Sequence, residues 1–95
     1  MKNIINLNND ITHINNRFET LPRDTDLNSF KKSGLFYCDG VINGPGSGNR
    51  QWGMMLEITN SNGTNLWQLF ALNSSNAIRV RLLYNSQFSE WSQIG

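Results

Sequence analysis

The sequence predicts a mainly β protein in which an N-terminal α-helical coiled coil precedes a small antiparallel β domain, with the chains assembled as a homotrimer. Three observations predict this architecture. Apolar residues alternate three and four positions apart near the N-terminus, short apolar segments alternate with turn residues over the rest of the chain, and those segments are apolar on both faces. A domain within 95 residues buries only about 60% of its unfolded surface, so oligomerisation is an expected source of stability.

The chain divides into three predicted parts. Residues 1–21 form a coiled-coil helix for trimerisation and attachment, residues 22–33 form a linker, and residues 34–95 form the β domain.

A narrow apolar stripe defines the predicted coiled coil. The residues expected to form the oligomerisation seam are Ile4, Leu7, Ile11, Ile14 and Phe18. Ile4, Ile11 and Phe18 occupy position a of the heptad, and nearly all other positions are polar. Such a two-in-seven stripe is typical of a coiled-coil seam. Isoleucine at position a with mixed leucine and isoleucine at position d does not settle the number of strands but leans toward three over two. The alternative is an amphipathic helix that folds back on the β domain of its own chain.

The linker begins where the helix is expected to end. Pro22 disfavours helical geometry at the preceding residue and has no N–H to donate. Leu27 and Phe30 are the apolar anchors of this polar segment, and either Asp26 or Asn28 is expected to cap a single helical turn.

Five short strands are predicted in the β domain, at residues 34–38, 51–59, 66–72, 77–85 and 90–94. The glycine-rich segment 39–49 is predicted to be a loop, since no lysine follows it in the register of a phosphate-binding loop. Asn62-Gly63 predicts a hairpin, and the regular spacing of turns predicts an antiparallel meander. Because several strands are apolar on both faces, we expect one face to pack the core and part of the other to pack a second subunit.

Composition excludes several kinds of partner. Eight basic and seven acidic residues give a formal net charge of +1, so nucleic acid is not an expected partner. No apolar stretch approaches the roughly 18 residues that span a bilayer, so membrane insertion is not expected. The N-terminus lacks the apolar run of a signal peptide, so the chain is expected to stay in the cytoplasm or to leave by lysis or assembly.

Catalytic chemistry has little support in the sequence, and no enzymatic activity, catalytic residue, metal or cofactor is predicted. His13 is the only histidine and is placed in the coiled coil, so one chain offers neither a histidine-dependent triad nor a multi-histidine metal site. Cys38 is the only cysteine, and its apolar neighbours predict a buried thiol. A glycosidase that pairs Glu57 with another carboxylate stays open, because such pairs form through space.

Aromatic and planar polar residues predict a ligand-binding surface. Trp52 lies beside the glycine-rich segment and is expected to be exposed, whereas Trp91 is expected in the core. Arg79 and Arg81 share one face of a strand and are expected to point away from the core. The predicted ligand-binding residues are Trp52, Asn49, Arg50, Gln68, Arg79, Arg81 and Tyr84. The alternative is that the tryptophans belong to the core or to a subunit interface.

A series of short motifs resembles a known family. In order, they are Asp26-Leu27-Asn28, Gly34-Leu35-Phe36-Tyr37, Asn43-Gly44-Pro45, residues 52–58, Gln68-Leu69-Phe70, Arg79-Val80-Arg81 and Phe88-Ser89-Glu90-Trp91-Ser92-Gln93-Ile94. Over residues 24–95 this series resembles the knob domain at the ends of phage tail fibres and pyocin fibres. The resemblance implies a trimeric β knob at a fibre tip that engages the bacterial surface, often its saccharides, and it implies no active site.

This resemblance sets the expected function and partners. The expected role is attachment of a phage or phage-like particle to its host through a surface glycan or protein, with another virion protein bound at the N-terminus. The protein would be made in the host cytoplasm and located in the virion. Because a tail fibre normally carries a long shaft before the knob, the alternative is a head fibre, decoration protein or capping protein without a receptor-binding role.

Overall fold

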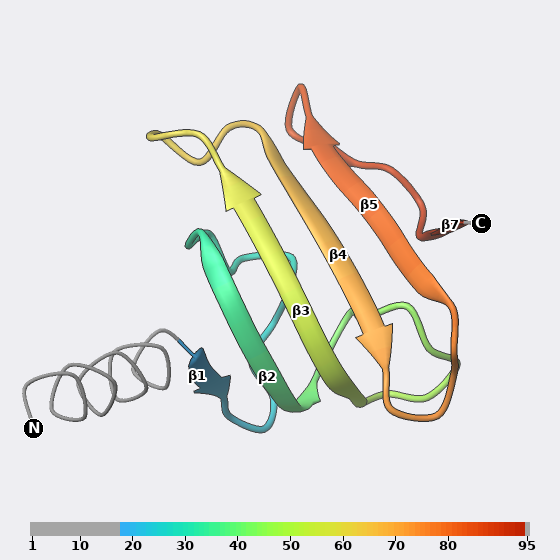
Figure 1. Ribbon diagram of the computed structural model, residues 1–95. Helices are drawn as coiled ribbons and strands as arrows, with labels where there is room; N and C mark the ends of the chain where they lie inside the picture. Colours follow the sequence, from blue (N-terminus) through green and yellow to red (C-terminus); the bar gives the residue numbers. More distant parts are fainter. Residues whose placement is uncertain (1–17, 95) are drawn as a thin grey trace, which may run out of the picture.

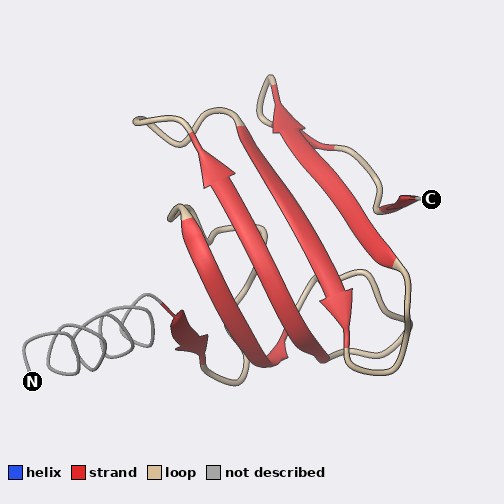
Figure 2. Ribbon diagram, in the orientation of Figure 1, coloured by secondary structure: helices blue, strands red, loops and turns tan. Residues whose placement is uncertain are grey.

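The computed structural model describes residues 18–94, which form one seven-stranded sheet (Figure 1; Figure 2). The strands are β1 (Phe18–Leu21), β2 (Gly34–Val41), β3 (Gln51–Thr59), β4 (Leu66–Leu72), β5 (Ile78–Tyr84), β6 (Gln87–Phe88) and β7 (Ser92–Ile94). They lie in the order β1-β2-β3-β4-β5-β6, and β7 also pairs with β5. Strand β1 is parallel to β2, and the other pairs are antiparallel. The predicted mainly β fold and its antiparallel meander are confirmed.

The predicted end of the N-terminal helix is wrong. Phe18–Leu21 forms β1, in which Phe18 pairs with Leu35 and Leu21 pairs with Cys38. Leu21 is only 4% exposed, because this pairing places it in the core. A partner far along the chain therefore decides its conformation. The other predicted seam residues and His13 lie outside the described residues.

Strands β3 and β4 have the predicted bounds, and β5 is shorter by one residue at each end. Strand β2 continues to Val41, three residues beyond its predicted end, through an irregularity between Asp39 and Val41. Gly40 lies at this bulge with φ +84°, a conformation that glycine adopts without strain. The predicted β3–β4 hairpin is confirmed: Gly63 has φ +71°, and its N–H donates to the carbonyl of Asn60 at 3.1 Å.

One face of the sheet is covered by loops, and this covered face holds the core. The buried core residues are Leu21, Leu27, Phe36, Cys38, Val41, Met55 and Phe70. The loops after β1 and β2 pass behind the sheet in Figure 1 and are joined where the N–H of Leu27 donates to the carbonyl of Ile42 at 3.1 Å. The Trp91 indole donates to the carbonyl of Asn43 at 3.1 Å, which brings the C-terminal segment to the same face.

The linker anchors lie as predicted. Leu27 is fully buried, and Phe30 is half-buried with its ring edge-on to Phe36 at 5.0 Å. The Asp26 carboxylate accepts the backbone N–H of Asn28 at 2.8 Å, so Asp26 caps the short turn.

The opposite face, which we call the open face, is largely apolar and exposed. By strand alternation it carries Tyr37, Trp52, Met54, Leu56, Ile58, Trp67, Leu69, Ile78, Val80, Leu82 and Tyr84. Of these, Ile58 is 53% exposed and Trp67 is 51% exposed. The prediction that the sheet is apolar on both faces is confirmed, and the packing of a second subunit on the open face stays a prediction.

Candidate binding surface

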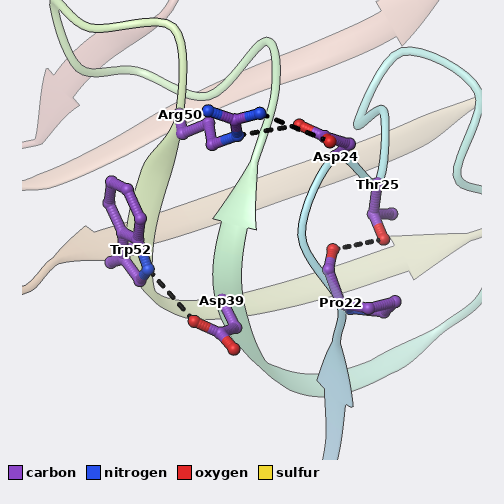
Figure 3. Close-up of polar contacts among 6 residues, drawn as sticks. All are labelled: Pro22, Asp24, Thr25, Asp39, Arg50 and Trp52. Atoms are coloured by element: carbon purple, nitrogen blue, oxygen red, sulfur yellow. Dashed lines mark hydrogen bonds and ion pairs between the residues drawn. The ribbon is translucent and has the colours of Figure 1, made fainter.

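Trp52 is held in place at the start of β3. It pairs with Asp39 of β2, and its indole Nε1 donates to Asp39 Oδ1 at 3.1 Å (Figure 3). The side chain is 39% exposed, so the predicted exposure of Trp52 is confirmed. A hydrogen bond at one edge of the indole fixes its orientation while leaving ring surface open to solvent.

Arg50 forms the second interaction of this surface. Its Nε donates to Asp24 Oδ1 at 2.8 Å, and its Nη2 lies 3.4 Å from Asp24 Oδ2 (Figure 3). The hydrogen bond from Arg50 lowers the pKa of Asp24 below its usual value. The pair joins the loop after β1 to the start of β3.

The backbone around Gly40 brings the two pairs together. A methyl group on Gly40 would lie 3.4 Å from Cζ2 of Trp52 and 3.5 Å from Cδ of Arg50. The N–H of Asp24 donates to the carbonyl of Gly40 at 2.8 Å. In the same turn the Thr25 hydroxyl donates to the carbonyl of Pro22 at 2.8 Å (Figure 3). The bulge and the turn therefore place an aromatic ring, a guanidinium and two carboxylates side by side. We call Asp24, Asp39, Arg50 and Trp52 the Trp52 surface.

Groups of these kinds are chemically able to contact a polar ligand such as a saccharide. An indole face contacts the apolar C–H face of a sugar, and carboxylate and guanidinium groups hydrogen-bond its hydroxyls. Asn49 is exposed next to Arg50 in the same loop. That loop is held by Gln51, whose side chain is 5% exposed and donates to the carbonyl of Gly48 at 2.6 Å.

Gln68 and Arg81 lie on the covered face, not at an exposed site. Gln68 is fully buried and Arg81 is 6% exposed. The prediction that Arg79 and Arg81 point away from the core is therefore wrong. Strand alternation does place the two arginines on the opposite face from Ile78, Val80 and Leu82. Those apolar side chains, however, lie on the open face and not in the core.

Gln68 connects two buried charged residues across three neighbouring strands. Its Nε2 donates to Glu57 Oε1 at 2.8 Å and to the carbonyl of Leu27 at 2.9 Å. Its Oε1 accepts from Arg81 Nε at 2.7 Å. We call Glu57, Gln68 and Arg81 the buried polar row.

Burial shifts both charged members of the row toward their neutral forms. Glu57 is fully buried, and its loss of hydration raises its pKa from 4.5 to about 7 against the opposing effects of Gln68, the Lys32 N–H and Arg81. Burial also lowers the pKa of Arg81 to about 10. The Arg81 guanidinium lies 3.8 Å from the ring centroid of Phe88 and 4.7 Å from that of Trp91, so aromatic faces replace part of its hydration.

The remaining predicted binding residues lie apart. Arg79 is half-buried on the covered face, and its Nε is buried with no hydrogen-bond partner among the described residues. Tyr84 is 61% exposed at the end of β5, whereas Trp52 lies at the start of β3. The structure therefore brings together Trp52 and Arg50, with Asn49 next to Arg50 in the chain, and it separates Gln68, Arg79, Arg81 and Tyr84 from them.

Sequence reasoning missed Asp24 and Asp39 as members of the Trp52 surface. Asp24 lies in the predicted linker and Asp39 directly precedes Gly40. Neither forms a recognisable sequence motif with Trp52 or Arg50. The length of β2 is the feature that could have revealed Asp39. Continuing the predicted strand to Val41 would have placed Asp39 opposite Trp52.

Other chemistry of the described residues is limited. Cys38 is buried as predicted, and burial raises its thiol pKa to about 12. Between residues 18 and 94, no three or more His, Cys, Asp or Glu side chains gather in a way that would hold a metal ion. The same part of the chain contains no helix long and apolar enough to cross a membrane.

The open face contains a shallow apolar hollow of about 230 Å³. It is lined by Leu35, Met54, Leu56, Leu69, Ala71 and Ile78. Contiguous exposed apolar surface of this kind is typical of interaction sites.

The fold is similar to that of a solved tail-fibre protein. The chain is similar to the selenomethionine structure of an N-truncated R2-type pyocin tail fibre, with a TM-score of 0.66 and 14% sequence identity. The match covers 81% of this chain and 32% of the pyocin chain, so the chain spans about a third of that protein. No family model and no curated protein matches the sequence. The predicted resemblance to fibre proteins is therefore confirmed at the level of the fold.

Proposed function

We propose that this chain is a fibre knob of a phage or phage-like particle and attaches that particle to a bacterial surface. The observation that carries the proposal is the similarity of its fold to a pyocin tail fibre. Such a role requires recognition without chemistry on the ligand, and the Trp52 surface suits it. Its indole and paired charged groups are exposed and held in place by hydrogen bonds. In this role the protein is a virion component, and its ligand is a surface glycan or protein.

The open face supports a homotrimer in this proposal. A 95-residue chain that leaves Leu56, Ile58 and Trp67 exposed has apolar surface to bury against other copies. The predicted coiled coil would add contacts between the same three chains. Light scattering at micromolar concentration should report three chains, and a stable monomer would contradict this part of the proposal.

Binding to whole bacteria and purified cell-wall glycans tests the attachment role. We expect saturable binding that Trp52→Ala abolishes while the circular dichroism spectrum stays unchanged. Trp52→Phe keeps an aromatic face but loses the hydrogen bond to Asp39, so it should retain part of the binding. Equal binding by the parent and Trp52→Ala would show that the Trp52 surface is not the binding site.

A structural role in the virion is the second candidate function, and the extent of the open face favours it. A head-fibre, decoration or capping protein could use that face to bind another virion protein without engaging a receptor. A correctly assembled trimer that binds no cell or glycan in the panel, yet binds purified particles lacking the protein, would support this role.

A further inference from the structure

A hollow of about 320 Å³, lined by both polar and apolar side chains, lies at the end of the sheet where β3 turns into β4. Three segments line it: the linker, the β3–β4 turn, and the end of β5 with β6. Ligand pockets in proteins begin at about this volume. From Trp52 to the end of β3 at Thr59 the strand spans roughly 23 Å, at about 3.3 Å per residue, so this hollow is separate from the Trp52 surface. We call it the turn hollow.

The β3–β4 turn presents prearranged polar groups to the turn hollow. Asn62 and Thr64 both line it. The Thr64 hydroxyl donates to Asn62 Oδ1 at 2.7 Å and accepts from Asn60 Nδ2 at 3.0 Å. These bonds hold both side chains, and the Asn62 amino group has no hydrogen-bond partner within residues 18–94. A ligand would therefore meet ordered donors at this wall, with little loss of side-chain entropy.

Lys31 gives the turn hollow a positive charge. It lines the hollow from the linker side beside Asn28, and no carboxylate is among the lining residues. Its aliphatic stem packs on the turn, since a methyl group on Gly63 would lie 3.0 Å from Lys31 Cδ. The two ion pairs found in residues 18–94 do not include Lys31. Its ammonium group therefore has no internal counter-charge in the described part of the chain.

The remaining wall combines apolar surface with a hydroxyl. Leu83 and Phe88 supply the apolar surface, and Ser86 supplies the hydroxyl. The Phe88 ring is held from another side by the Arg81 guanidinium at 3.8 Å. The ring is thereby positioned, and the hollow has aromatic and aliphatic surface in addition to its amide groups.

We propose that the turn hollow binds an acidic sugar residue, meaning a hydroxylated ring that carries one carboxylate. The amide and hydroxyl groups match the ring hydroxyls, Leu83 and Phe88 match its C–H surface, and Lys31 pairs with the carboxylate. The inference adds a second binding site to the chain and does not depend on the Trp52 surface.

Titration of the full 95-residue chain with sodium glucuronate, followed by amide chemical shifts in NMR, tests this proposal. Saturable shifts are expected at Asn62, Gly63, Thr64 and Ser86, with weaker effects from glucose. Lys31→Met keeps the stem and removes the charge, so glucuronate should bind about fivefold more weakly, as expected for one partly exposed ion pair. Glucose binding should be unchanged in this variant.

Three controls separate the possible outcomes. Lys32→Met removes the same charge one residue away, outside the turn hollow, and should leave glucuronate binding unchanged. Asn76→Ala, in the exposed loop after β4 and outside the turn hollow, should also leave it unchanged. Inorganic phosphate should bind more weakly than glucuronate, because it has no ring to contact Phe88. The proposal is overturned by absent or scattered shifts, by equal effects of Lys31→Met and Lys32→Met, by phosphate binding as tightly as glucuronate, or by shifts centred on the Trp52 surface. The last of these results would leave the proposed attachment role standing.

Discussion

Trp52 and Asp39 lie opposite each other on neighbouring antiparallel strands, and the indole N–H of Trp52 donates to the Asp39 carboxylate at 3.1 Å. This contact turns a tryptophan on an exposed sheet face into an oriented aromatic surface. Since Gly40 forms a bulge directly after Asp39, the same strand end also brings Arg50 and Asp24 to the indole.

Asp39→Ala should release the Trp52 ring. Because the hydrogen bond is partly exposed, the free energy of unfolding should fall by less than about 1 kcal/mol. The Trp52 indole N–H should exchange faster with solvent in NMR spectra. Asp39→Asn keeps an oxygen acceptor and serves as the matched control. Unchanged indole exchange in Asp39→Ala would show that this contact does not hold the ring.

Gln68→Leu should strongly destabilise the fold. The change removes the partner of both Glu57 Oε1 and Arg81 Nε in the protein interior, so the free energy of unfolding should fall by about 2–4 kcal/mol. Urea denaturation measures the change. Gln87→Leu, at an exposed position of β6, should stay within about 0.5 kcal/mol of the parent. A small effect of Gln68→Leu would mean that water takes over the hydrogen bonds to Glu57 and Arg81.

Glu57 should make stability fall as pH rises from 4.5 to about 7. Its pKa is raised in the folded chain, so unfolding releases a proton in this window, and the stabilisation present below pH 4.5 is lost as pH passes through 7. The loss is on the order of 3 kcal/mol. Urea denaturation between pH 4.5 and 8 measures it.

Glu57→Gln is the control for this pH dependence, because it keeps the side-chain shape and removes the titration. Every other titratable group is unchanged in this variant. Asp24 acts in the opposite direction and at lower pH, since its lowered pKa gives stability that is lost on acidification. An identical slope in the parent and Glu57→Gln would contradict the assignment to Glu57.

Leu56→Arg should dissociate the proposed trimer. Leu56 is 38% exposed on the open face and lines its apolar hollow, so a single chain tolerates the charge there, whereas a buried subunit interface does not. Light scattering should fall to the mass of one chain with the β circular dichroism spectrum retained. Ser61→Arg, in the exposed β3–β4 turn, should leave the mass unchanged. Equal masses for both variants would show that the open face is not part of the subunit interface.

Cys38 should be inert to a thiol reagent such as dithiobisnitrobenzoate in the folded protein. Its side chain is fully buried and its pKa is raised to about 12, so almost no thiolate is present at neutral pH. Labelling should appear only across the urea unfolding transition. Rapid labelling without denaturant would show that β2 opens locally.

The strand pattern was largely predictable, whereas the assignment of the two faces was not. Strands β3 and β4 have their predicted bounds because turn residues flank them on both sides. Period-two alternation correctly grouped Arg79 with Arg81, but it does not say which face the loops cover. Apolar Ile78 and Val80 suggested the core, whereas the loops after β1 and β2 cover the other side.

Residues 18–21 show a second feature that the sequence pattern could not predict, namely pairing with a distant strand. Phe18 completed a helical spacing with Ile14 and Ile11, yet Phe18–Leu21 pairs in parallel with β2. That pairing joins residues 17 positions apart, and local periodicity carries no information about such a partner.

Local chemistry along the chain was enough to specify strands β3 and β4, the Asn62-Gly63 hairpin between them and the apolar character of both sheet faces, because these depend on neighbours in sequence. Folding in three dimensions decided that Gln68 joins Glu57 to Arg81 in the interior and that Asp39 meets Trp52 at the surface. These contacts depend on strand register, on a bulge at Gly40 and on loops that cover only one face, and each of these arises from pairing between distant segments.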